Sequence, residues 1–144
     1  MTPVAQDPVA DYLSLAAVPR ENVSEVEVFL RRQASDSRNT LAVLERPDQP
    51  VALLQIHAGE ATLFSFLPSP GGRTAVHETY IGRIYDATIT QVHALETVAG
   101  ASAPKPERVE ITGSRLGGMI NLTDYTAEER AGLMAALREV VARG

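Results

Sequence analysis

Residues 40–67, TLAVLERPDQPVALLQIHAGEATLFSFL, decide the fold of this chain. They contain three short runs rich in residues that favour β-strands, at 40–46, 51–57 and 61–67. The segments between the runs, Arg-Pro-Asp-Gln-Pro and Ala-Gly-Glu, have the composition of turns. Short turns join strands that run in opposite directions, so this stretch predicts a three-stranded antiparallel meander.

The meander is expected to continue on its carboxyl side. Pro-Ser-Pro-Gly-Gly at 68–72 is the strongest turn signal in the chain, and residues 74–80 after it predict a fourth strand. Because alternate residues of a strand point to the same side, we expect one face of these strands to be buried. The residues assigned to that face are Ala52, Leu54, Ile56, Phe64 and Phe66.

Two helices are predicted before the meander. Asp7 precedes a proline at the first helical position, and apolar residues follow at helical spacing, which predicts a helix over residues 8–17. Ser24 and Glu27 have the spacing of a capping box, which predicts a second helix that ends at about Ala34.

The region after the fourth strand supports two interpretations. Residues 81–99 carry many β-branched side chains, but their apolar residues recur at helical spacing. We weigh the helix above the strand, because long periodic signals outweigh local propensity. Residues 101–106 are then expected to form a loop, and residues 108–112 and 118–122 to form a closing hairpin.

The last predicted element is an amphipathic helix, since Thr126 and Glu129 have the spacing of a capping box and an apolar stripe follows to about Ala142. Together the elements predict an α+β fold in one domain, residues 1–144. Helices are expected on one face of an antiparallel sheet of about five to six strands. The order helix, three or four strands, helix, two strands, helix is similar in topology to the small acidic escort proteins of bacterial protein secretion.

Composition excludes several classes of protein. The chain has 144 residues and no cysteine, which excludes a disulfide scaffold and a thiolate metal site. Because 44% of its residues are hydrophobic, a disordered chain is excluded as well. The formal net charge of −5 disfavours nucleic acid and anionic lipid as partners. No basic signal segment and no run of roughly 18 apolar residues is present, so we expect a cytoplasmic protein with no membrane partner.

Imidazole chemistry is limited to His57, His77 and His93. On the predicted helix His93 and Glu96 share a face, but two ligands are too few for a stable metal site, and a solvated helix face is the favoured interpretation. His57 and His77 are expected on one face of the sheet, offset by roughly 13 Å, which is too far for a proton relay. We therefore expect no metal and no cofactor, and an enzyme is the less favoured class.

The segment Gly113-Ser114-Arg115-Leu116-Gly117-Gly118 is rich in glycine and carries an arginine, a combination that can hold a phosphate or a carboxylate. A phosphate loop also needs the amino terminus of a following helix, whereas residues 119–122 are predicted to be a strand. The tip of a hairpin is therefore the favoured interpretation of this loop.

Two hypotheses for function remain. The first is a non-enzymatic protein–protein interaction module, such as an escort, inhibitor or immunity protein, that binds a protein partner or forms a homodimer through an edge strand at 40–46 or 74–80. The second is a small-molecule-binding protein or cofactor-independent enzyme with a pocket between the sheet and the predicted helix at 83–99. The candidate residues of that pocket are Tyr80, Tyr85, Asp86 and His93.

Overall fold

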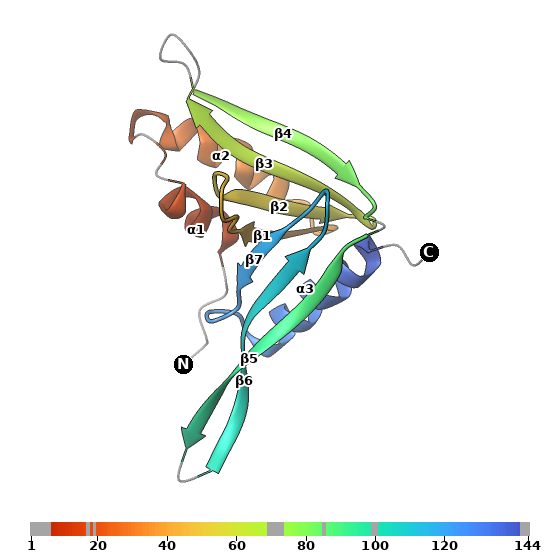
Figure 1. The fold of residues 1–144 in the computed structure, drawn as a ribbon. Helices are drawn as coiled ribbons and strands as arrows, with labels where there is room; N and C mark the ends of the chain where they lie inside the picture. The colour runs from red at the N-terminus through yellow and green to blue at the C-terminus, as the bar shows by residue number, and fades with distance from the viewer. Residues whose placement is uncertain are drawn as a thin grey trace.

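The computed structural model describes residues 7–16, 18, 20–68, 74–84, 86–98 and 101–141, which form the predicted α+β fold (Figure 1). The helices are α1 (Pro8–Leu15), α2 (Val23–Ala34) and α3 (Ala127–Val140), with a 3₁₀ turn, η1 (Arg20–Asn22), before α2. The strands are β1 (Asn39–Leu44), β2 (Ala52–His57), β3 (Glu60–Pro68), β4 (Thr74–Gly82), β5 (Thr88–Val98), β6 (Ala101–Thr112) and β7 (Gly118–Asn121).

The strands form two sheets, whereas the sequence predicted a single sheet of five to six strands. β1 to β4 make the predicted antiparallel meander, and β5 to β7 make a second antiparallel sheet. Among the described residues one backbone pair joins them: the N–H of Glu45 donates to the carbonyl of Met119, and that of Met119 donates to the carbonyl of Glu45, both at 2.9 Å. Both sheets contribute apolar side chains to one shared core, which requires them to stack rather than merge edge to edge.

Strands β1 to β3 of the four-stranded sheet are buried on both faces (Figure 1), whereas residues 77–80 of β4 are exposed. On one face α1 and α2 close a core that contains Tyr12, Leu30 and Leu53. On the other face the second sheet and α3 close a core that contains Leu54 and Leu137. The expectation that helices pack on one face only is therefore wrong, and the meander is the middle layer of the fold.

The predicted grouping of Phe64 and Phe66 with Leu54 is also wrong. β2 and β3 pair Leu53 with Phe64 and Leu54 with Leu63, so the two phenylalanines belong to the core under α1 and α2. Alternation does not reveal this arrangement, because both faces of β2 and β3 carry apolar side chains. The opposite core holds the remaining residues of the predicted face, namely Ala52, Leu54 and Ile56.

The register of β2 and β3 follows from the two-residue turn between them. Ala58 and Gly59 have φ angles of 50° and 77°, both positive, as the two-residue turn of a tight hairpin requires. A Cβ atom on Gly59 would lie 3.3 Å from the Cγ of Glu139 in α3. Glycine therefore supplies the backbone conformation and also lets α3 pass close to the turn.

Residues 81–99 do not form the predicted helix. β4 continues to Gly82, β5 takes up Thr88–Val98, and the predicted loop at 101–106 belongs to β6. The ladder between β5 and β6 and the β-branched residues of this segment outweigh the helical spacing of its apolar residues. The predicted order, which resembles that of the escort proteins, has a helix between the meander and the closing hairpin. The structure has the strand β5 there, so the similarity in topology does not hold at this position.

The closing hairpin is confirmed, because β6 and β7 pair Arg108 with Asn121 and Ile111 with Gly118. β7 pairs with residues 108–111 of β6. The hairpin of β5 and β6 extends beyond these residues, to the pair of Val98 with Ala101. Figure 1 shows its far end extending away from the helices.

The helix ends follow local capping chemistry. α1 begins as predicted, with the carboxylate of Asp7 accepting from the backbone N–H of Ala10 at 3.3 Å. α2 begins one residue before Ser24, with Asn22 at the N-cap position, so the predicted capping role of Ser24 is wrong. In α3 the predicted capping box is present: Thr126 Oγ1 accepts from the backbone N–H of Glu129, and the Glu129 carboxylate accepts from that of Thr126. None of the helices in the described part of the chain has the length and apolar character needed to cross a membrane.

Tyr12→Phe is expected to lower the free energy of unfolding by about 1–3 kcal/mol, measured by urea denaturation. The buried hydroxyl of Tyr12 accepts a hydrogen bond from the backbone N–H of Phe66 at 2.7 Å, and its removal leaves that N–H without a partner. Tyr80→Phe is the control, because the Tyr80 hydroxyl lies at the surface, and its expected change is within about 0.5 kcal/mol. Equal losses in the two variants would contradict this account of Tyr12.

Candidate functional site

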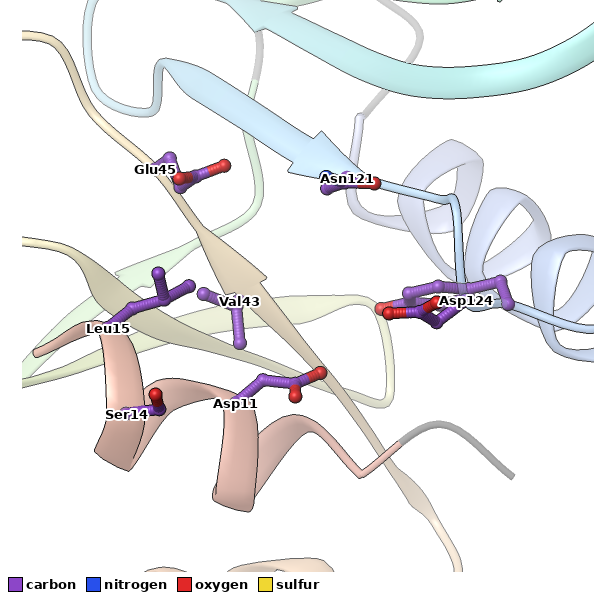
Figure 2. Close-up of a pocket in the computed structure, with 8 residues that line it drawn as sticks. Asp11, Ser14, Leu15, Val43, Glu45, Asn121 and Asp124 are labelled. Atoms are coloured by element: carbon purple, nitrogen blue, oxygen red, sulfur yellow. The ribbon is translucent and has the colours of Figure 1, made fainter. Parts of the chain in front are cut away.

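A cavity of about 290 Å³ lies between α1, the end of β1 and the connection from β7 to α3 (Figure 2). We call it the acidic cavity, because its lining includes three carboxylates. The residues that line it are Asp11, Ser14, Leu15, Val43, Glu45, Asn121, Asp124 and Tyr125. They come from parts of the chain that are far apart in sequence, so the cavity exists only in the folded protein.

The side of the cavity formed by α1 follows from the amphipathic pattern of that helix. Val9 and Tyr12 are buried against the four-stranded sheet. Ser14 and Leu15 follow Asp11 by three and four residues, so the three side chains lie on one face of the helix, next to the buried face. Leu15 is 55% exposed, so the cavity has an apolar residue at its rim.

The opposite side is a turn held at both of its ends. The Asn121 side-chain oxygen accepts from the backbone N–H and from the hydroxyl of Thr123, at 2.8 and 2.6 Å. The N–H of Tyr125 donates to the carbonyl of Leu122, and Thr126 caps α3 immediately afterwards. Asp124 and Tyr125 are therefore held in a fixed turn rather than in a long loop.

The charges of the cavity are all negative. Among the residues that the structure describes, its lining contains the carboxylates of Asp11, Glu45 and Asp124, and no lysine, arginine or histidine. Figure 2 shows the carboxylates of Asp11 and Asp124 turned toward each other across the hollow, with β1 between them. Within the described parts of the chain, neither Glu45 nor Asp124 has a basic partner within salt-bridge distance. The cavity therefore presents hydrogen-bond acceptors that suit a cation.

Tyr125 adds a second feature that points to a ligand. Its side chain is 8% exposed, and its hydroxyl is buried without a hydrogen-bond partner among the described residues. Burial raises the pKa of the Tyr125 phenol, and the negative charges of Glu129 and Asp11 raise this pKa further, so the phenol is neutral. A buried hydroxyl without a partner costs about 1–3 kcal/mol, which a ligand that hydrogen-bonds to it would recover.

Of the site residues predicted from the sequence, the three that the structure describes, Tyr80, Asp86 and His93, do not line the acidic cavity. Tyr80 lies on β4, is 64% exposed and donates from its hydroxyl to Glu60 at 2.7 Å. Asp86 lies between β4 and β5 and accepts a hydrogen bond from the hydroxyl of Ser114. His93 is exposed on β5, and Tyr85 lies outside the described residues. Because residues 88–98 form a strand, the helix that was expected to form one wall of the predicted pocket is not present in this segment.

The histidines are separated by the sheet itself. His57 lies on the face of Leu53, where its Nδ1 is 2.7 Å from the side-chain oxygen of Asn39. His77 pairs with Ser65 and lies on the opposite face, because its neighbour Val76 belongs to the core under α1 and α2. The expectation that His57 and His77 share a face is wrong. In the part of the chain that the structure describes, no three potential metal ligands are grouped to hold a metal ion.

Tyr125→Phe is expected to leave the free energy of unfolding unchanged or to raise it by up to about 1–3 kcal/mol, since it removes a buried hydroxyl that has no partner. Urea denaturation beside Tyr12→Phe provides the comparison, because there the hydroxyl has a buried partner. A loss of stability as large as that of Tyr12→Phe would show that the Tyr125 hydroxyl is bonded in the free protein.

Comparison with known proteins gives no relative from which a role could be transferred. No protein-family model, curated protein or solved structure matches this chain.

Proposed function

We propose that this protein is a non-enzymatic protein–protein interaction module, in the broad class of escort, inhibitor and immunity proteins, and that the acidic cavity receives a basic side chain of its partner. The observation that carries the proposal is the combination of three carboxylates with a buried phenol, in a cavity where the described residues supply neither a basic side chain nor a partner for the phenol hydroxyl.

An arginine side chain of the partner has the chemistry that this cavity accepts. A guanidinium group has five N–H donors in one plane, so it can donate to carboxylates on two sides and to a phenol oxygen. Asp11 and Asp124 face each other from opposite walls (Figure 2), and the hydroxyl of Tyr125 requires a partner. A volume of about 290 Å³ is at the lower limit of small-molecule sites, and it suits a single inserted side chain.

The surroundings of the cavity also favour a protein as the partner. Leu15 at the rim is 55% exposed, and an apolar residue next to the inserted arginine would cover it. The formal net charge of −5 attracts a basic segment over a longer range than the cavity alone.

The first test is titration of the ¹⁵N-labelled protein with acetyl-Leu-Arg-Leu-amide, followed by NMR chemical shifts. We expect saturable shifts around Asp11, Glu45 and Asp124. Asp11→Asn and Asp124→Asn should each weaken binding by roughly tenfold or more, because each removes a charge-assisted hydrogen bond of about 1.5–3 kcal/mol. Glu25→Gln, which removes an exposed carboxylate on α2, is the matched control and should leave binding unchanged.

The same peptide with citrulline in place of arginine separates charge from shape. Citrulline keeps the length of the side chain and loses its positive charge, so equal binding of both peptides would overturn the proposal. Arginine amide without flanking leucines tests the alternative, a small-molecule-binding protein. If the free amino-acid amide binds as tightly as the peptide, the cavity is a site for a small cation and not for a protein.

Self-association is the second form of partnership that the sequence predicted, and we propose β4 as its edge. Within the described residues β4 pairs only with β3, whereas β1, the other outer strand, is already bonded to Met119 next to its end. Light scattering on a size-exclusion column is expected to show a concentration-dependent dimer. Glu78→Pro, in the exposed half of β4, should abolish it by removing a backbone donor that points away from β3. A monomer at every concentration would contradict this.

A further inference from the structure

A second cavity, of about 400 Å³, lies on the other side of the junction between the two sheets. It is lined by the turn after β1 (residues 46–49), by Leu63 of β3 and by the end of β6 with the glycine-rich loop (residues 111–118). We call it the arginine cavity, because Arg46 and Arg115 both border it. It shares no lining residue with the acidic cavity.

Arg46 carries a charge that no carboxylate among the described residues balances. Its Nε and Nη2 atoms donate to the carbonyl oxygen of Pro50, at 3.0 and 2.7 Å, which is a neutral acceptor. No carboxylate of the described residues lies within salt-bridge distance of it. Burial lowers the pKa of the Arg46 guanidinium, which is the effect of removing a charge from water without supplying a counter-charge.

Arg115 is positioned by contacts that leave most of its donors unused. Its Nη2 donates to the carbonyl oxygen of Ile81 at 2.6 Å, and within the described residues no carboxylate pairs with it. The hydroxyl of Ser114 donates to Asp86, so that acid is engaged with the loop. A Cβ on Gly113 would lie 3.0 Å from the Cβ of Ala87, so the loop also packs closely against the connection between β4 and β5. The loop that carries Arg115 is therefore held in place before any ligand binds.

We infer that the arginine cavity binds an oxyanion, the phosphate or carboxylate group of a small molecule, through Arg46 and Arg115. Two guanidinium groups whose hydrogen bonds within the described residues all go to backbone carbonyls supply the donors and the charge that such a group needs. Asp48 is the one acid among the described residues of the lining, so these residues keep a net positive charge against a chain of net charge −5. The site differs from the acidic cavity in its residues and in the charge of its ligand, so either proposal can fail without the other.

The test is NMR titration of the ¹⁵N-labelled protein at low ionic strength with inorganic phosphate and, separately, with acetate. We expect saturable shifts in residues 111–118 with at least one of the two anions, and none with glycerol at the same concentrations. Arg115→Gln is expected to weaken binding by roughly tenfold or more, since it removes a charge-assisted contact with the anion.

Two further variants make the result specific. Arg46→Lys keeps the charge and loses the planar fork, and it should weaken binding less than Arg46→Gln does. Arg138→Gln removes an exposed arginine on α3 and should have no effect. Saturation by phosphate alone identifies a phosphate site, and saturation by acetate alone identifies a carboxylate site. Absence of saturation with both anions, or equal weakening in Arg138→Gln, would overturn the inference.

Discussion

Burial of strands β1 to β3 on both faces is the constraint on which the rest of the structure depends. Leu53 and Leu54 are adjacent in β2, point to opposite sides and are both fully buried. Each contributes about 1.5–3 kcal/mol only if a separate layer covers it. Helices α1 and α2 cover one of them, and the second sheet with α3 covers the other. Both candidate cavities lie where these covering layers meet the ends of the central strands.

Much of the fold could be predicted from local sequence signals. The meander, α1, the closing hairpin and the capping box of α3 all depend on contacts between residues near in sequence, such as Thr126 with Glu129. Residues 88–98 could not be assigned in this way, because their conformation depends on pairing with β6. Two sheets were predicted as one for a related reason: continuous apolar runs in β1 and β2 show that strands are buried, but not which layers bury them.

The acidic cavity could not be predicted from the sequence, because its residues are brought together only by the tertiary fold. Asp11, Glu45 and Asp124 belong to three elements, and nothing in their local sequence marks them as neighbours. The one local signal was that they lie near turns and helix starts, where acids are commonly found for capping alone. Tyr125 is informative only through its burial, which is a property of the packed structure. The predicted site residues, in contrast, depended on a helix at 83–99 that the chain does not form.

The hairpin turn at Ala58 and Gly59 determines how this protein tolerates changes in chain length. In most strands an inserted residue would move apolar side chains into water, and the resulting cost would restore the original alignment. β3 is apolar on both sides, so the hydrophobic effect opposes such a slip only weakly. The pairing of β2 with β3 therefore depends on the positive φ angles of Ala58 and Gly59. An insertion in this turn would move the side chains of β3 from each core into the other.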